Sequence, residues 1–189
     1  MNTITRRDLL KATAASTAVV SLGLSPAIAK SSSAKEEVRL GVIGTGGRGG
    51  GLIKDFANCD GARLVALCDA DSSRVENRAA ALKETSGDKV DAYIDYRQLL
   101  DRDDIDAVVI AAPNHWHALM TIHACQAGKH VYTEKPVCHT VWEGRKMVEA
   151  AKKYNRIAAG GFQNRSDVGL REAMPLIHNG TYGAITQAR

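Results

Sequence analysis

The stretch that most constrains the fold is residues 38–51, which read VRLGVIGTGGRGGG. A short apolar run, residues 40–43, leads directly into the pattern Gly44-x-Gly46-x-x-Gly49. Gly44 allows a sharp turn, the missing side chain at Gly46 lets a ligand approach the backbone, and Gly49 lets the next helix pack close to the strand. This order predicts a strand, a tight turn and a helix start whose free N–H groups face an anion.

The anion that such a turn usually holds is the pyrophosphate of a dinucleotide. Glycine-rich loops also arise for flexibility in many folds, so the surrounding sequence has to decide. The basic side chain inside the loop could add a charged contact to the phosphates. The candidate phosphate-binding residues are Gly44, Gly46, Gly47, Arg48 and Gly49.

The first 29 residues have the features of an export signal. Arg6 and Arg7 precede an alanine-rich stretch, residues 12–24, and an A-x-A motif ends at Ala29. The stretch is short and rich in Ala, Ser and Thr, which argues against a membrane anchor. It resembles a twin-arginine leader, so we expect periplasmic export by the twin-arginine machinery, with cleavage after about Ala29 and a linker at residues 30–37. Because that route carries folded proteins, we also expect a tightly held dinucleotide.

Length and composition suit one globular domain with a small appendage. The chain has 189 residues, 44% of them hydrophobic, and a net charge of +4 with basic and acidic residues interspersed. Nothing in this pattern indicates a nucleic-acid partner or a polybasic membrane surface. The four cysteines lie far apart without a C-x-x-C pair, so neither a zinc site nor a disulfide framework is indicated.

Strand and helix patterns alternate along the chain, which predicts an α/β fold with a doubly wound parallel sheet. After the glycine loop, Leu52, Ile53 and Phe56 recur at helical spacing. Further strands are expected at residues 63–68, 91–94, 105–112, 130–133 and 157–160, and helices at residues 72–85, 96–101, 116–127 and 141–154. The last of these helices is expected to turn Val141, Met147, Val148 and Ala151 inward.

Ligands of such sheets bind beyond the carboxyl ends of the strands. Asp69 ends the second strand twenty residues after Gly49, where a carboxylate can accept hydrogen bonds from ribose hydroxyls. The alternative is a helix cap, a role that Asp71 or Ser72 can fill instead. Arg74 could favour a 2′-phosphate, but the carboxylate would repel one, so we expect NAD in preference to NADP.

The fourth strand is followed by Pro113, Asn114, His115, Trp116 and His117. The two histidines could form a metal pair, but no further ligands accompany them at usable spacing, so no metal site is predicted. We expect these residues to shape the nicotinamide pocket, with the proline and the tryptophan as its walls.

Lys135 follows the fifth strand. Pro136 restricts it to an extended backbone, and a partly desolvated lysine near a nicotinamide cation has a lowered pKa. It could then orient a substrate hydroxyl and take its proton. An ordinary surface lysine is the alternative.

Together, the glycine pattern, Asp69, Pro113-Asn114-His115 and Glu134-Lys135-Pro136 resemble the glucose-fructose oxidoreductase, inositol dehydrogenase and rhizopine-catabolism (Gfo/Idh/MocA) family. The similarity covers residues 38–165, and the E-K-P motif is its most specific part. The resemblance implies an NAD(P)-binding Rossmann domain over these residues and substrates among sugars, inositols and polyols. It implies that Lys135 is the catalytic lysine. The residues that it places near the cofactor are Asn114, His117, Glu134 and Asn164.

Members of this family are longer and carry a second, α+β substrate domain. We therefore expect residues 166–189 to begin a truncated copy of that domain, with a turn and an opening strand over residues 180–189. The expected function is oxidation of a sugar or polyol hydroxyl, and a homo-oligomer is an open alternative for a full-length protein. A non-catalytic nucleotide-binding fragment is one competing hypothesis. A second is redox-cycling glycoside cleavage, but the exported relatives with that activity carry Glu-Val-Pro where this chain has Lys135, which favours the dehydrogenase.

Overall fold

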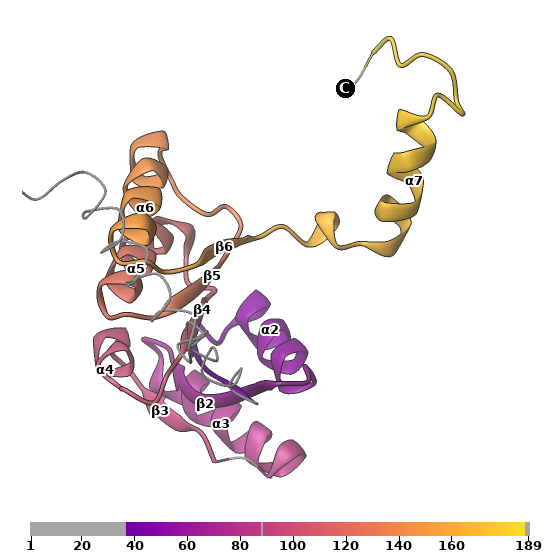
Figure 1. Cartoon of the computed structure of the whole chain (residues 1–189). Helices are drawn as coiled ribbons and strands as arrows, with labels where there is room; N and C mark the ends of the chain where they lie inside the picture. Colours follow the sequence, from indigo (N-terminus) through magenta and orange to yellow (C-terminus); the bar gives the residue numbers. More distant parts are fainter. Residues whose placement is uncertain (1–36, 88, 188–189) are drawn as a thin grey trace, which may run out of the picture. The chain divides into compact units, whose positions relative to one another are not determined.

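A computed structural model describes residues 37–87 and 89–187 of the chain. The expected signal peptide, residues 1–29, lies outside the described residues. The described part forms a 6-stranded parallel sheet of order β3-β2-β1-β4-β5-β6 with helices on both faces, so the doubly wound fold is confirmed (Figure 1). The strands are β1 (Val38–Ile43), β2 (Ala62–Cys68), β3 (Asp91–Tyr93), β4 (Ala107–Ile110), β5 (His130–Glu134) and β6 (Ala158–Gly161). The helices are α2 (Gly47–Ala57), α3 (Ser72–Ser86), α4 (Tyr96–Leu100), α5 (Asn114–Gln126), α6 (Val141–Lys153), the 3-10 helix η1 (Gln163–Arg165) and α7 (Val168–His178).

The core consists of two apolar clusters, one on each face of the sheet. Side chains alternate along β4, where Val108 and Ile110 join the cluster beneath α4, α5 and α6, and Val109 joins the one beneath α2 and α3. Successive side chains of a strand point to opposite faces of the sheet, so one near-continuous apolar run contributes residues to both clusters. Because both faces of the central strands are covered, the carboxyl ends of these strands are held in a fixed arrangement.

Local signals set the ends of several helices. The Asp71 carboxylate accepts a hydrogen bond from the Arg74 amide at 3.3 Å, so Asp71 is the cap of α3 and Asp69 is free of that role. A capping box of Thr140 and Glu143 begins α6. Gly128, which follows the C-cap Ala127 of α5, takes a φ of +75°, the left-handed backbone that favours glycine.

Several expected boundaries and orientations are wrong. Helix α5 begins at Asn114 rather than at residue 116, so the polar residues after β4 form its first turn instead of a loop. On α6 the prediction fails for Val141 and Val148, which are 86% and 54% exposed. Met147 and Ala150 are the buried residues of that helix, because α6 follows the edge of the sheet and only a narrow side of it is covered.

The carboxyl-terminal segment also differs from expectation. The turn is present, since the Gly183 amide donates to the Gly180 carbonyl, but residues 181–187 contain no strand. A strand needs a neighbouring strand to take its hydrogen bonds, and none is provided here among the described residues. Helix α7, which the sequence analysis did not predict, has no buried residue.

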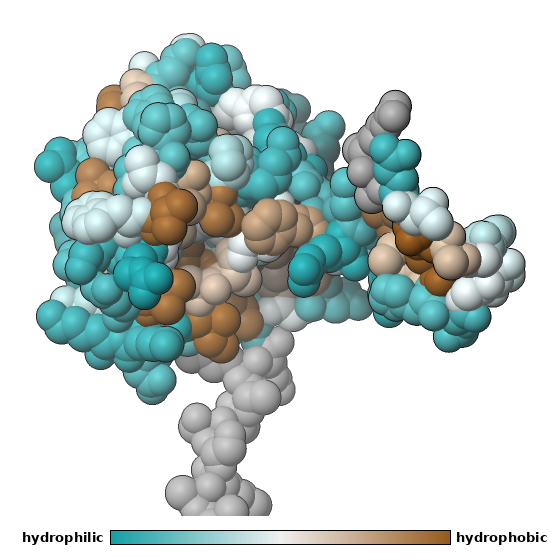
Figure 2. Space-filling model, turned by 90° about the horizontal axis from the view of Figure 1, so that it is seen from above, coloured by the Kyte–Doolittle hydropathy of each residue, from teal (hydrophilic) through white to brown (hydrophobic). Residues whose placement is uncertain are grey.

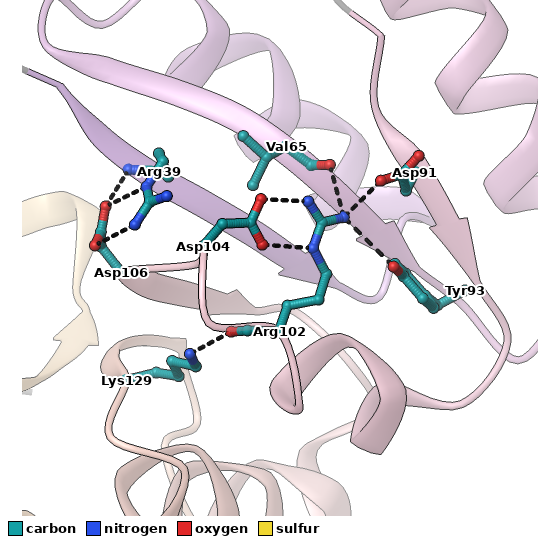
Figure 3. Close-up of polar contacts among 8 residues, drawn as sticks. All are labelled: Arg39, Val65, Asp91, Tyr93, Arg102, Asp104, Asp106 and Lys129. Atoms are coloured by element: carbon teal, nitrogen blue, oxygen red, sulfur yellow. Dashed lines mark hydrogen bonds and ion pairs between the residues drawn. The ribbon is translucent and has the colours of Figure 1, made fainter.

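A polar network fixes the amino-terminal edge of the sheet (Figure 3). The Arg102 guanidinium forms two hydrogen bonds with Asp104, at 2.8 and 2.6 Å, and one with Asp91 at 2.7 Å. The hydrogen bonds to Asp104 are the main cause that raises the pKa of Arg102. Since Arg102 also reaches the Val65 carbonyl and the Tyr93 hydroxyl, this network joins β2 and β3 to the loop before β4.

Apolar side chains remain exposed around α6 and β6. Figure 2 shows apolar surface gathered on the face seen from above. A groove of about 620 Å³ lies between α6 and β6, and Met147, Val148 and Phe162 contribute to its wall. Within the described ranges, no helix has the length and apolar character needed to cross a membrane.

Candidate functional site

A cleft of about 820 Å³ lies at the carboxyl ends of β1, β2 and β4, where the topology predicts a ligand. Its size falls in the range of small-molecule and cofactor sites. The expected site residues that line it are Gly44, Gly46, Gly47, Arg48, Asp69, Pro113 and Trp116. The structure therefore brings together residues that are up to 72 positions apart, from Gly44 to Trp116.

The glycine turn leaves no room for side chains at two of its positions. Gly44 has a φ of +90°, and a Cβ there would lie 2.6 Å from the Ala111 carbonyl carbon. A Cβ on Gly49 would collide with the Gly44 carbonyl oxygen. These contacts show why the turn needs glycine: β1, β4 and α2 meet here backbone to backbone.

The start of α2 is open to an anion. Gly46 is its N-cap, no side chain caps it, and its first turn carries no acidic residue. The first N–H groups of a helix have no partner inside the helix, and the helix dipole places partial positive charge beside them. The free N–H groups at the start of α2 therefore fit the pyrophosphate of a dinucleotide.

Asp69 stabilises the glycine turn through hydrogen bonds and also lines the cleft. Its Oδ2 accepts hydrogen bonds from the Thr45 amide at 2.7 Å and the Thr45 hydroxyl at 3.0 Å, and its Oδ1 accepts one from the Asp71 amide at 3.1 Å. Thr45 is fully buried. Thr45 is a site residue that was not predicted, although its hydroxyl between the first two glycines of the motif was the available signal.

Two arginines from α3 border the same turn. Arg74 lines the cleft and pairs with Asp71 at 3.7 Å, and Arg78 donates to the Thr45 carbonyl at 3.3 Å. Pro113 and Trp116 line the same cleft as Asp69 and Arg74. Their expected contact with the nicotinamide stays a prediction.

His117 is buried and contacts two backbone carbonyl groups of the protein itself. It is 2% exposed, its Nδ1 lies 2.7 Å from the Pro136 carbonyl oxygen, and its Nε2 lies 2.7 Å from the Ala112 carbonyl oxygen. His117 thus ties the E-K-P turn to the end of β4, while Asn114 and His115 are exposed in the first turn of α5. In the part of the chain that the structure describes, no group of three His, Cys, Asp or Glu side chains is placed to hold a metal ion.

Glu134 is the most connected of the expected site residues. Its carboxylate is buried and accepts hydrogen bonds from Arg48 Nε at 3.0 Å and from Gln163 Nε2 at 3.2 Å. The Arg48 side chain is 43% exposed and borders the cleft, and the hydrogen bond with Glu134 is the main cause that raises its pKa. Arg48 therefore belongs to an ion pair that crosses from α2 to the end of β5.

Lys135 and Asn164 lie outside the lining of the cleft. Lys135 is exposed, is joined to Pro136 by a cis peptide bond, and has no side-chain partner among the described residues. Asn164 lines a neighbouring hollow of about 670 Å³ that Arg48 also borders. It is Gln163, rather than Asn164, that reaches Glu134, because consecutive side chains of a 3-10 helix point about 120° apart.

Comparison with known proteins identifies the family. Residues 38–162 match the model of the Gfo/Idh/MocA oxidoreductase family, described as an NAD-binding Rossmann fold. The chain belongs to the Gfo/Idh/MocA family. Residues 3–23 match the signal sequence of the twin-arginine translocation pathway, which supports export of this Gfo/Idh/MocA protein.

Curated relatives of this Gfo/Idh/MocA chain include two named for glycoside hydrolysis. A glycosyl hydrolase family 109 protein of Shewanella sp. (strain ANA-3) is 41% identical over 126 residues, 64% of this chain and 27% of the relative. An alpha-N-acetylgalactosaminidase of Shewanella oneidensis is 34% identical over 174 residues, 81% of this chain and 38% of the relative. The chain thus spans less than half the length of either relative.

Solved structures similar to this Gfo/Idh/MocA domain include inositol dehydrogenases. The myo-inositol 2-dehydrogenase of Lactobacillus plantarum aligns with a TM-score of 0.70 at 32% identity, covering 79% of this chain and 43% of the other. The scyllo-inositol dehydrogenase of Lactobacillus casei, solved with NAD(H) and scyllo-inositol, aligns with a TM-score of 0.71 at 26% identity, covering 79% and 43%. NAD(H) is thus a cofactor of a neighbour with the same fold.

Proposed function

We propose that this chain is the nucleotide-binding part of an NAD-dependent oxidoreductase that oxidises a CH–OH group of a sugar or polyol. The observation that carries the proposal is the cleft in which the uncapped start of α2 and the Asp69 carboxylate lie together at the carboxyl edge of the sheet. Family membership supports the reaction class, and the inositol substrate named for one structural neighbour supports the substrate class.

Each group in the cleft has a part in binding. The N–H groups at the start of α2 hold the pyrophosphate. Asp69, which lines the cleft and whose Oδ1 accepts only one hydrogen bond from the described part of the protein, accepts an adenosine ribose hydroxyl. The carboxylate disfavours a 2′-phosphate, so we propose NAD rather than NADP, with Arg74 as the feature that favours the alternative. When bound, the nicotinamide supplies the hydride acceptor.

Lys135 is proposed as the group that takes the hydroxyl proton. It lies one residue beyond the buried Glu134, at the end of β5, on the same edge of the sheet as the glycine turn. Its exposure leaves the ammonium group open to a substrate. We propose residues 38–165 as the nucleotide-binding domain and residues 166–189 as the beginning of the substrate domain.

Redox-cycling glycoside cleavage is the second candidate. The names of the glycosyl hydrolase family 109 relative and of the alpha-N-acetylgalactosaminidase favour it, whereas Lys135 favours net oxidation. In both reactions the sugar is oxidised at one carbon by NAD, but the glycosidase returns the hydride within the same cycle. A non-catalytic nucleotide-binding role is the third candidate, and it predicts cofactor binding without either product.

The products distinguish these candidates. A protein in which this domain is joined to a complete substrate domain is incubated with NAD and either free polyols or aryl glycosides. Net NADH without sugar release supports the dehydrogenase, and sugar release without net NADH supports the glycosidase. Lys135→Met should abolish turnover with NADH affinity unchanged, and Lys54→Met, which removes an exposed lysine of α2, should leave turnover intact. Normal turnover of Lys135→Met would refute the role of this lysine.

Export adds a demand on the cofactor. We propose that the protein works in the periplasm after cleavage near Ala29 and that it arrives there with its dinucleotide bound. Native mass spectrometry of protein recovered from the periplasm should show the mass of the dinucleotide complex. Empty but folded protein would contradict this part of the proposal.

A further inference from the structure

The Glu134 carboxylate joins three separate segments. Only 3% of this residue is exposed, and its donors are Arg48 Nε from α2, Gln163 Nε2 from η1 and the Lys135 backbone amide, the last at 3.2 Å to Oε2. Arg48 Nε is bound to Oε1 at 3.0 Å. Both carboxylate oxygens therefore have donors from the protein itself, and the residue is buried and outside the lining of the cleft, which together leave Glu134 little capacity to bind a ligand.

Arg48 faces two sides. It borders the cofactor cleft and also the hollow beside η1, and its side chain is 43% exposed while that of Glu134 is 4% exposed. The bond to Glu134 uses Nε, so the two terminal nitrogens serve other partners, with Asp55 at 3.8 Å from one of them. A guanidinium can therefore hold Glu134 and meet a phosphate at the same time.

We infer that Arg48 and Glu134 are positioning residues that link occupancy of the phosphate site to the Lys135 turn. This inference rests on the proposed function. A pyrophosphate at the start of α2 attracts the terminal nitrogens of Arg48, and the Nε–Oε1 bond moves with them. The same carboxylate accepts a hydrogen bond from the Lys135 amide through Oε2. The turn that carries the proposed catalytic lysine therefore responds to a phosphate bound at Arg48, although Arg48 and Lys135 are 87 residues apart in the sequence.

The Lys135 amide can be observed alone. The dipeptide Glu-Lys occurs once in the sequence, at residues 134–135. Labelling the 189-residue chain with carbonyl-¹³C glutamate and ¹⁵N lysine therefore selects a single amide signal in NMR spectra. The probe is ADP, which carries the adenosine and the pyrophosphate but no nicotinamide, so it has no group that reaches toward Lys135 from the substrate side.

The expected result is a shift of this amide signal when ADP saturates the wild-type protein. Arg48→Met should bind ADP about three- to tenfold more weakly and should show no shift at saturation. Glu134→Gln should lose the shift as well, and it serves as the second variant if Arg48→Met does not fold. This variant is labelled with carbonyl-¹³C glutamine in place of glutamate, which again selects the Lys135 amide because the wild-type sequence contains no Gln-Lys dipeptide. The matched control is Arg74→Met, which removes another arginine of the cleft and should keep the shift despite weaker binding.

The outcomes separate this inference from the proposed function. Binding of ADP to the wild-type chain without a shift overturns the link and leaves the proposed function standing. A shift that persists in Arg48→Met and Glu134→Gln also overturns it. Failure of both ADP and NADH to bind the folded chain overturns the proposed function, and the inference falls with it.

Discussion

Replacement of Gly49 by alanine should disturb the glycine turn by a direct collision with backbone. The new Cβ would collide with the Gly44 carbonyl oxygen and lie 2.9 Å from the Gly44 carbonyl carbon. No side-chain rotation can relieve a collision with backbone, so we take the upper value for an overpacked site, about 3 kcal/mol. Alanine gains up to about 1 kcal/mol of helix propensity over glycine, which leaves a net loss of about 2 kcal/mol of unfolding free energy.

Gly51→Ala is the matched control, two residues further along α2. A Cβ there would meet nothing closer than an Arg48 nitrogen at 3.7 Å, an ordinary contact. The control should keep the helix gain and become up to about 1 kcal/mol more stable. Urea unfolding followed by circular dichroism measures both changes, and titration with NADH should show at least about tenfold weaker binding for Gly49→Ala alone. Equal stability and equal NADH affinity of the two variants would refute the close packing described for this turn.

Three further predictions concern other parts of the molecule. Arg102→Met should cost about 1–3 kcal/mol of unfolding free energy, because it removes the hydrogen bonds of a guanidinium whose side chain is 19% exposed, while its partners Asp91 and Asp104 are 52% and 48% exposed. Arg97→Met, at a side chain that is 71% exposed, should cost less than about 1 kcal/mol, and urea unfolding distinguishes the two variants. Burial raises the pKa of the Cys68 thiol to about 12, so Cys68 should resist alkylation at pH 8 while the exposed Cys59 reacts, as mass spectrometry can show. Because the thiol of the unfolded chain ionises first, stability should fall as pH rises from about 9 toward 12, and this part of the fall should be absent in Cys68→Ala. Asp69→Asn should lower the preference for NADH over NADPH by about tenfold in calorimetric titrations, and an unchanged preference would count against the proposed role of the carboxylate.

The sequence allowed prediction of the parts of the fold that depend on local patterns. The alternation of apolar runs and helical spacing predicted the order of strands and helices, and the glycine pattern predicted the turn between β1 and α2. Boundaries were less accurate. Helix α5 begins two residues early because Asn114 and His115 continue the helix without any apolar side chain that would have indicated it.

Contacts between distant residues could not be predicted from local patterns. Nothing near Arg48 in the sequence indicates that its partner is Glu134, 86 positions away. The exposure of Val148 likewise depends on where the sheet ends, and the spacing of apolar residues along α6 does not indicate which of them the sheet covers. Which of Gln163 and Asn164 donates a hydrogen bond to Glu134 depends on the conformation of η1, because either side-chain amide could have reached the end of β5 in an extended chain.

The central claim is that the cleft at the carboxyl edge of the sheet binds NAD through the start of α2 and Asp69. Isothermal titration calorimetry of NADH into the 189-residue chain tests it most directly. We predict saturable one-to-one binding that ADP displaces and that Gly49→Ala weakens while Gly51→Ala does not. Absence of binding to the folded chain at millimolar NADH, or equal binding by both alanine variants, would contradict the claim.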